Sequence, residues 1–159
     1  MAETPTPKTE NWWEAFPAPR ARCPEMSADE LYAAFDDMDI KNEPRSFLLV
    51  DVRRNDWEGG TIKTSLNLPA QSFYQSRKTL LELCDRASIT RVIFYCGSSS
   101  GRGPRCAGWM QDYINDVSKF GRKSELKVFV LQGGIKGWVK DFEGSMVDGF
   151  EAKYWEQFL

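Results

Sequence analysis

Residues 92–105 read Val-Ile-Phe-Tyr-Cys-Gly-Ser-Ser-Ser-Gly-Arg-Gly-Pro-Arg and pass from an apolar run into a glycine-rich segment. The apolar run predicts a buried strand, and the residues after Pro104 keep an apolar face at helical spacing. Between them lies a C-x(5)-R motif, Cys96 to Arg102, which we call the oxyanion loop. A loop of this length between a strand and a helix can close its backbone amides around a tetrahedral anion. We therefore expect Cys96 beneath the anion and Arg102 beside it.

The residue types of the oxyanion loop suit nucleophilic chemistry on an anion. A cysteine reacts as its thiolate, which unpaired N–H groups at a helix N-terminus stabilise. Arg102 offers a planar fork that can bind two oxygens of a phosphate-like group. Cys96 and Arg102 are therefore the expected catalytic residues. The small residues between them leave the amides unshielded and are the expected substrate-binding residues: Gly97, Ser98, Ser99, Ser100 and Gly101.

A C-x(5)-R spacing also arises by chance, so a structural interpretation stays open. In that interpretation Cys96 is a buried free cysteine that ends a strand, and the glycines only make a turn. The strand before the motif, the glycines around it and the helix after it favour the catalytic interpretation.

Two further segments resemble known family signatures. Residues 126–138 contain the pattern Val-x-x-Leu-x-Gly-Gly-x-x-x-Trp, which resembles the closing signature of the rhodanese-homology superfamily. Residues 47–69, with Asp-Val-Arg at 51–53 and Glu-Gly-Gly at 58–60, resemble the early block of cell-division-cycle-type dual-specificity phosphatases. Those phosphatases and the eukaryotic arsenate reductases are the branches that carry a C-x(5)-R loop on this fold. Sulfurtransferases of the superfamily usually have a shorter loop.

The resemblance, which covers roughly residues 28–145, implies an α/β, rhodanese-like fold. Such a fold has a parallel sheet of about five strands with helices on both faces. The order of predicted strands and helices agrees, because strands that alternate with helices build a covered parallel sheet. Ligands of these sheets bind at the carboxyl ends of the strands, where Cys96 falls. The resemblance also implies a phosphorylated substrate or a small oxyanion as the partner of the enzyme.

The chain departs from the family pattern at positions that affect the chemistry. The phosphatases have histidines where this chain has Tyr95 and Thr61, and Val52 replaces a cysteine that can protect the nucleophile in a disulfide. The loop lacks the glutamate of the phosphatases, so no general acid is identified. Asp56 and Glu58 are candidates by type, with a solvated surface charge as the alternative for each. The chain has no histidine, which excludes a Cys-His pair and a histidine-ligated metal, and we expect no metal site.

Asp51 and Arg53 are the expected supporting residues. They can brace the oxyanion loop from the neighbouring strand end, and a purely structural ion pair explains them equally well. Cys106 can form a disulfide with Cys96, but its place in the apolar stripe of the following helix favours a core cysteine.

Length and composition predict a single catalytic domain. The 159 residues are 42% hydrophobic, enough for one core. A net charge of −2 provides no basic field for nucleic acid, and no apolar run approaches the ~20 residues that span a membrane. The scattered cysteines and the absence of a signal pattern suit a reducing compartment, the cytoplasm or the nucleus. We expect no bound cofactor.

Residues 1–24 are predicted to form an N-terminal arm, and residues 25–159 the rhodanese-like catalytic domain. The first ten residues look disordered. Trp12, Trp13 and Phe16 favour docking on the domain over binding a partner, because large rings favour burial. The expected elements are a helix opened by the capping box at 27–30, strands at 47–51, 65–67, 91–95 and 126–131, a helix over 78–87 and a C-terminal helix or arm at 154–158.

Several functions share the same anion cradle. In the first, hydrolysis of phosphotyrosine-type or aryl phosphate esters, Cys96 attacks phosphorus and water clears the cysteinyl-phosphate. In the alternative, arsenate reduction, the thiolate attacks arsenic, and external glutathione and glutaredoxin complete the electron transfer. Thiosulfate sulfurtransfer ranks lower. A non-catalytic binding module has no reason to keep both Cys96 and Arg102.

Overall fold

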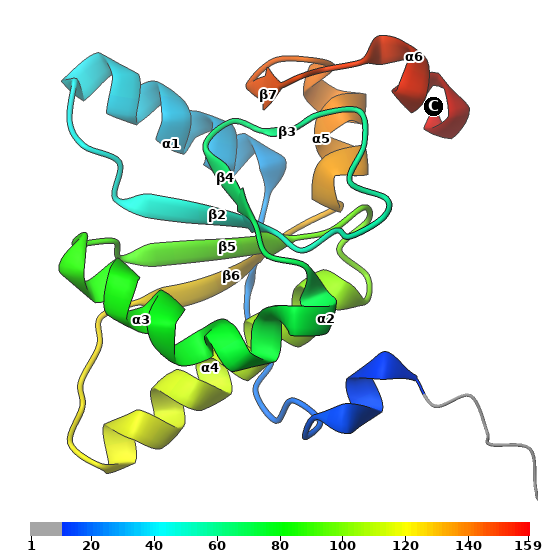
Figure 1. Ribbon diagram of the computed structural model, residues 1–159. Coiled ribbons are helices and arrows are strands. Elements are labelled where there is room, and N and C mark those ends of the chain that lie inside the picture. The colour runs from blue at the N-terminus through cyan, green and yellow to red at the C-terminus, as the bar shows by residue number, and fades with distance from the viewer. Residues whose placement is uncertain (1–10) are drawn as a thin grey trace, which may run out of the picture.

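The computed structural model describes residues 11–159 and has a parallel sheet as its central layer (Figure 1). The strand order is β1-β6-β5-β2-β4, and every neighbouring pair is parallel. This confirms the predicted α/β fold with about five parallel strands. In sheet order the strands are β1 (Glu25–Met26), β6 (Lys127–Leu131), β5 (Arg91–Tyr95), β2 (Phe47–Asp51) and β4 (Ser65–Asn67).

Helices cover both faces of the sheet (Figure 1). One face carries α1 (Ala28–Lys41) and α5 (Gly134–Phe142). The opposite face carries α2 (Ala70–Phe73), α3 (Arg77–Arg86) and α4 (Arg102–Lys119). A separate cluster of buried apolar side chains fills each layer. The core therefore has two parts, with the sheet between them.

Short elements complete the chain. They are the antiparallel pair β3 (Thr61–Ile62) and β7 (Val147–Asp148), the helical turn α6 (Ala152–Trp155), and the 3₁₀ turns η1 (Trp12–Ala15), η2 (Tyr74–Ser76) and η3 (Glu156–Phe158). The three two-residue strands, β1, β3 and β7, were not predicted, because two residues are too few to show a periodicity.

The central strands are buried on both faces. All five residues of β2 are buried, and in β5 only Arg91 is partly exposed. Near-continuous apolar sequence is expected of parallel strands covered by helices, and each buried Val, Leu, Ile or Phe stabilises the fold by roughly 1.5–3 kcal/mol. The register places Asp51 opposite Tyr95 at the carboxyl ends of the two strands. The segments that follow β2 and β5 therefore start side by side.

The predicted start of α1 is confirmed at its cap. The Ser27 hydroxyl oxygen accepts a hydrogen bond from the N–H of Glu30 at 3.1 Å. The bond satisfies one of the N–H groups that the first turn of a helix leaves without an acceptor. The strands β2, β4 and β5 coincide with their predicted ranges. Two elements differ by one residue: α3 (Arg77–Arg86), predicted over about 78–87, and β6 (Lys127–Leu131), predicted over 126–131.

The aromatic part of the N-terminal arm lies on α4. The Trp109 indole N–H donates to the carbonyl oxygen of Pro17 at 2.7 Å. The Trp109 ring also meets the rings of Trp12 and Phe16 edge-on, with centroids 6.2 and 5.6 Å away. The predicted disorder of the first ten residues falls outside the described residues.

Asp112 fastens the arm, because its carboxylate accepts backbone N–H bonds from Arg20 and Ala21 at 2.8 and 2.9 Å. We expect Asp112→Ala to lower the free energy of unfolding by roughly 2–4 kcal/mol, since two amides lose a charged acceptor. Asp116→Ala, which removes only an exposed partner of Arg20, should cost roughly 0.2–1 kcal/mol. Urea denaturation compares the two variants, and equal losses would contradict the role of Asp112.

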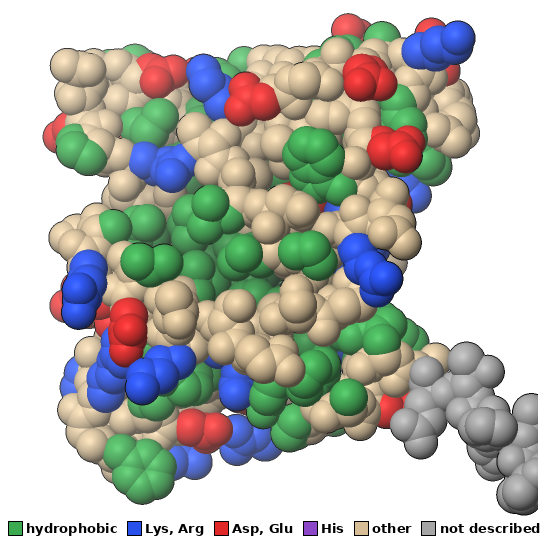
Figure 2. All heavy atoms as spheres, in the orientation of Figure 1, with side chains coloured by type: hydrophobic (Ala, Val, Ile, Leu, Met, Phe, Trp, Pro, Cys, Tyr) green, Lys and Arg blue, Asp and Glu red, His purple; other side chains and the backbone are tan. Residues whose placement is uncertain are grey.

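Charged side chains of both signs are interspersed over the face in Figure 2, whose hollowed middle shows hydrophobic side chains. Among residues 11–159, no helix has the length and apolar character needed to cross a membrane.

Candidate functional site

The oxyanion loop leaves the carboxyl end of β5 and leads directly into α4. It lies at the edge of the sheet where α5 also begins (Figure 1). Ligands of α/β sheets bind at this edge, because loops and helix N-termini meet there. The helix starts two residues before Pro104, so Arg102 is its first residue.

Cys96 lies at the floor of the loop, with 3% of its surface exposed. The N–H of Gly103, in the first turn of α4, points at the sulfur with an N···Sγ distance of 3.4 Å. N–H groups in the first turn have no acceptor within the helix and carry partial positive charge. The Cys96 sulfur therefore faces the N-terminal end of α4.

Ser99 makes the tight bend of the loop. Its backbone has a φ of 56°, in the left-handed region that residues with a Cβ seldom adopt. Its hydroxyl oxygen accepts the N–H of Cys96 at 3.4 Å, and its side chain is buried. Ser98 and Ser100 are exposed, and their hydroxyls lie 2.8 Å apart in a hydrogen bond. The buried Ser99 hydroxyl therefore stabilises the bend, while Ser98 and Ser100 remain at the surface of the loop.

The backbone N–H groups of residues 97–101 are available to bind an anion. Within the part of the chain that the structure describes, none of these N–H groups has a hydrogen-bond acceptor. Gly97 and Ser99 are buried, and buried N–H groups are seldom left without a partner. A tetrahedral oxyanion is the kind of acceptor that a run of such amides fits.

The carbonyl groups of the loop face the first turn of α5. The N–H groups of Ile135 and Lys136 donate to the carbonyl oxygens of Cys96 and Gly97 at 3.1 and 2.9 Å. Gly134 makes this approach possible, because a Cβ there would lie 2.5 Å from both oxygens. The N–H and C=O of a trans peptide point in opposite directions. Holding the carbonyls toward α5 therefore turns the following amides toward the other side, where an anion would bind.

Replacement of Gly134 tests the hydrogen bonds from the first turn of α5 to the carbonyl groups of Cys96 and Gly97, which we call the clamp. We expect Gly134→Ala to lower the free energy of unfolding by roughly 2–4 kcal/mol, because the new methyl group meets two carbonyl oxygens at a φ of 59°. Gly137→Ala is a control in the same helix. Its Cβ would have its nearest neighbour at 3.8 Å, so it should be neutral or stabilising by up to about 1 kcal/mol. Wild-type stability of Gly134→Ala in chemical denaturation would refute the clamp.

The Arg102 guanidinium is paired end-on with the carboxylate of Asp56. Nη1 donates to Oδ1 at 2.7 Å and Nη2 donates to Oδ2 at 2.6 Å. The hydrogen bond from Arg102 lowers the pKa of Asp56 to about 2. Asp56 therefore lies at the surface, with 46% of its side chain exposed, but its charge is paired with Arg102. A carboxylate held in this way stays ionised and does not serve as a general acid while it is paired.

A titration of the Asp56 carboxyl checks this pairing. Because the folded pKa lies below the usual value, the pair stabilises the fold above about pH 4, and that stabilisation is lost as the pH falls toward 2. The Asp56 carboxyl carbon should titrate in NMR spectra with a midpoint near pH 2. In Arg102→Gln the midpoint should return toward about 3.9. A midpoint near 3.9 in the unmodified protein would show that no such pair forms.

Asp51 and Arg53 form a buried ion pair, with Nη2···Oδ2 at 2.8 Å and side chains 0% and 1% exposed. Arg53 also donates to the carbonyl oxygens of Glu58 and Gly60 at 3.0 and 2.7 Å. These bonds brace the segment 56–60 and do not reach the oxyanion loop itself. The pair is linked to the candidate site through Asp56, which this segment carries. It is also linked through Thr61, which donates to Asp51 Oδ2 at 2.9 Å and lies 2.9 Å from the Tyr95 hydroxyl.

Tyr95 and Thr61 stand where the phosphatases that the chain resembles have histidines, and they contact each other. The Tyr95 hydroxyl lies 2.9 Å from Thr61 Oγ1 and 2.7 Å from Ser65 Oγ, and it accepts the N–H of Ile62 at 3.2 Å. Tyr95 is fully buried, and burial raises its pKa, so the hydroxyl is neutral. A polar network thus links the end of β5 to β3 and β4.

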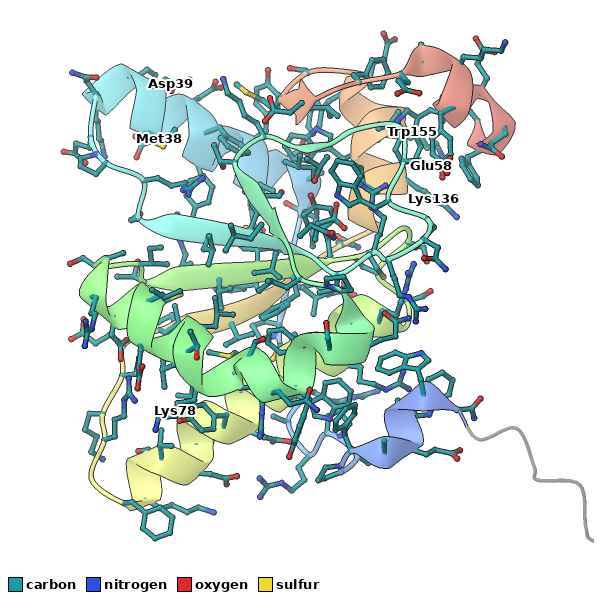
Figure 3. The ribbon with its side chains drawn as sticks, in the orientation of Figure 1. Met38, Asp39, Glu58, Lys78, Lys136 and Trp155 are labelled. Atoms are coloured by element: carbon teal, nitrogen blue, oxygen red, sulfur yellow. The ribbon has the colours of Figure 1, made fainter. Side chains whose placement is uncertain are left out.

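Two further side chains approach the site without a clear signal in the sequence (Figure 3). The Trp155 indole N–H donates to the carbonyl oxygen of Gly59 at 2.7 Å. The end of the Lys136 side chain lies against Gly97, where an added Cβ would be 3.5 Å from its Cε and 3.9 Å from its Nζ. The Lys136 Nζ also lies 4.4 Å from the ring centroid of Phe158. The positions of Trp155 and Lys136 depend on contacts between segments that are distant in the sequence. A pattern within a few neighbouring residues does not predict such contacts.

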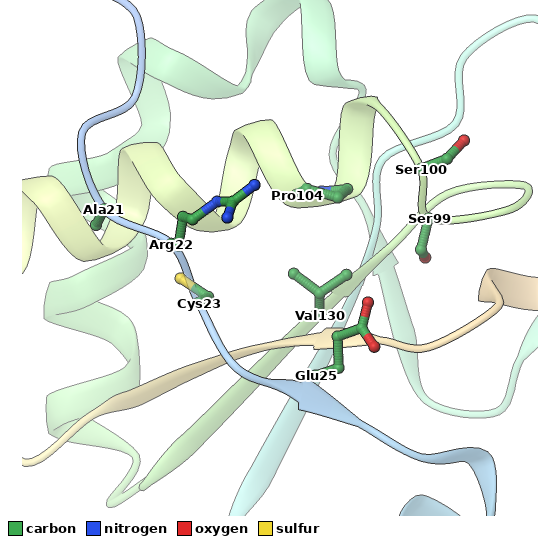
Figure 4. A pocket seen from close by; sticks show the side chains of 8 residues that line it. All are labelled: Ala21, Arg22, Cys23, Glu25, Ser99, Ser100, Pro104 and Val130. Atoms are coloured by element: carbon green, nitrogen blue, oxygen red, sulfur yellow. The ribbon is translucent and has the colours of Figure 1, made fainter.

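A cavity of about 460 Å³ lies against the outer side of the oxyanion loop (Figure 4). It is lined by Ala21, Arg22, Cys23, Glu25, Ser99, Ser100, Pro104 and Val130. Burial raises the pKa of the Cys23 thiol to about 11, so this thiol is neutral at physiological pH. A neutral thiol is a poor nucleophile, so Cys23 is not the candidate nucleophile.

All four cysteines are free thiols, and Cys106 belongs to the apolar core as the sequence favoured. Burial raises the pKa of the Cys106 thiol. Among residues 11–159, no group of three or more Cys, Asp or Glu side chains is placed to hold a metal ion.

Residues 27–141 match the family model of the rhodanese-like domain, so the predicted resemblance is confirmed. Human M-phase inducer phosphatase 2 is 32% identical over 93 residues, which are 57% of this chain and 16% of that protein. Arsenical-resistance protein 2 of Saccharomyces cerevisiae is 27% identical over 105 residues, 62% of this chain and 78% of that protein. The crystal structure of Saccharomyces cerevisiae Ygr203w, a homolog of single-domain rhodanese and the Cdc25 phosphatase catalytic domain, is also similar. Its TM-score is 0.64 at 27% identity, covering 84% of this chain and 91% of that one.

Proposed function

The chain belongs to the rhodanese-like domain family, and we propose that it is a cysteine-dependent enzyme that hydrolyses phosphotyrosine-type or aryl phosphate esters. One observation carries the proposal. The loop that follows Cys96 carries a run of amides, residues 97–101, with no acceptor among residues 11–159, and the Gly103 amide at its end donates to the Cys96 sulfur. Similarity to phosphatases over this region supports the reaction class.

In the proposed reaction Cys96 Sγ attacks phosphorus, and the bond from phosphorus to the leaving oxygen breaks. The leaving oxygen departs with the bonding electron pair. The amides of residues 97–101 and Arg102 stabilise the charge on the other three oxygens. Water then attacks the cysteinyl-phosphate, the S–P bond breaks, and inorganic phosphate and the thiolate are released.

The state of Asp56 favours aryl esters as substrates. The carboxylate is held by Arg102 and its pKa lies at about 2, so it has no proton to donate near neutral pH. A phenolate can depart without full protonation, whereas an alkoxide is far more basic and requires a proton donor. Hydrolysis should therefore be fastest for esters of acidic phenols.

The same observation favours arsenate reduction as a second candidate. Here the Cys96 thiolate attacks arsenic, and an oxygen leaves as water, so no acid suited to an alcohol is needed. External thiols, from glutathione and glutaredoxin, then supply two electrons: the sulfur–arsenic bond breaks, arsenic(V) leaves as arsenic(III), two external thiols become a disulfide, and the Cys96 thiolate is released. Similarity to arsenical-resistance protein 2 over most of that protein's length supports this candidate.

A paired assay on one preparation separates the candidates. Release of a phenol from an aryl phosphate is compared with reduction of arsenate by glutathione and glutaredoxin. Cys96→Ser should abolish whichever activity is present, whereas Cys23→Ser should leave it within about twofold, because the Cys23 thiol is neutral. If the folded protein hydrolyses no aryl ester but reduces arsenate, the second candidate replaces the first. Activity in Cys96→Ser would overturn both.

We expect Arg102→Lys to keep the fold but to reduce turnover by roughly 10²-fold or more. A lysine ammonium is a point charge and does not reproduce the two-pronged contact of a guanidinium. Steady-state kinetics measure the loss, and chemical denaturation checks that the fold is retained. Turnover close to that of the unmodified enzyme would count against the role of Arg102.

A further inference from the structure

We infer that Asp56 is a positioning residue of this site: its carboxylate holds the Arg102 guanidinium end-on, so that another edge of the guanidinium faces the bound oxyanion. This inference rests on the proposed function, because it concerns how the same site holds its anion. It assigns a role to an acidic residue that the sequence offered only as a general acid or a surface charge.

The pairing leaves much of the guanidinium available. An arginine carries five N–H donors in a planar fork, and Asp56 takes one from each terminal nitrogen, at 2.7 and 2.6 Å. The other N–H groups of Arg102, including that of Nε, form no hydrogen bond within residues 11–159. The edge formed by Nε and the adjacent terminal nitrogen presents two parallel N–H groups. That edge matches two oxygens of a phosphate-like anion.

The segment that carries Asp56 is fixed rather than free. The buried guanidinium of Arg53 donates to the carbonyl oxygens of Asp56 and Gly60 at 3.4 and 2.7 Å. From the other side the Trp155 indole N–H donates to the carbonyl oxygen of Gly59 at 2.7 Å. Asp56 is therefore held in place before any ligand arrives. A preformed contact of this kind orders the long Arg102 side chain and removes part of the entropy that anion binding would otherwise cost.

Two other roles for Asp56 make opposite predictions. If Asp56 only competes with the anion for Arg102, then removing its charge should tighten anion binding, because a like charge is lost. If Asp56 is the general acid, then its removal should penalise basic leaving groups most. A positioning residue should instead weaken anion binding, and its loss should affect all leaving groups equally.

The first measurement is calorimetric binding of tungstate, a tetrahedral dianion, to the full chain. Asp56→Asn should weaken tungstate binding about tenfold, because the amide offers one acceptor where the carboxylate offers two. Glu58→Gln is the matched control: it removes an exposed acidic charge from the same segment and should change affinity by less than about twofold. Tighter binding by Asp56→Asn would overturn the inference.

The second measurement is kcat/KM for a series of aryl phosphates whose phenols differ in acidity. The positioning role predicts the same loss, about ten- to a hundredfold, for every member of the series in Asp56→Asn. A loss that grows with the basicity of the leaving phenol would make Asp56 the general acid and overturn the inference.

Asp56→Glu keeps the charge and moves the carboxylate by one methylene, which guards against a folding defect in Asp56→Asn. It should also weaken tungstate binding, severalfold, and unchanged affinity in this variant would overturn the inference. Tungstate binding requires no turnover, so the two proposals fail separately. Asp56-dependent tungstate binding without ester hydrolysis by the unmodified protein would uphold the inference and refute the proposed function.

Discussion

The hydrogen bonds from the first turn of α5 to the carbonyl groups of Cys96 and Gly97 are the constraint on which the site depends. They hold one side of the oxyanion loop against a helix, so the amides that follow turn to the opposite side. Only a residue without a Cβ fits at position 134, because the two carbonyl oxygens occupy that space. Gly133 and Gly134 lie far from the C-x(5)-R motif in the sequence, but the two segments form one structural unit.

The parts of the fold that could be predicted are those with a local pattern. The long apolar runs of β2 and β5, the Ser27 cap and the oxyanion loop each carry their signal within a few neighbouring residues. The pairing of Asp56 with Arg102 had no such signal. The two residues lie 46 positions apart, and both belong to types that are usually solvated at a surface. Sequence reasoning identified both residues but could not bring them together, because only tertiary packing places them in contact.

Thr61 and Tyr95 belong to one polar network beside the candidate site. Both positions depart from the family pattern, and the two hydroxyls lie 2.9 Å apart in one network with Ser65. A histidine can change its charge between pH 5 and 8, whereas a buried tyrosine with a raised pKa stays neutral over that range. The hydrogen-bonded link between Tyr95 and Thr61 therefore keeps its charge state over the physiological pH range.

The bond between Trp155 and Gly59 joins residues 96 positions apart and closes the segment that carries Asp56. Such a distant contact forms late, because a long stretch of chain must be ordered before it is made. Loosening of the turn around Trp155 would remove one of the two braces on the Asp56 segment, the other being Arg53. The Cys96 loop, which α5 holds, would stay formed while its arginine lost alignment.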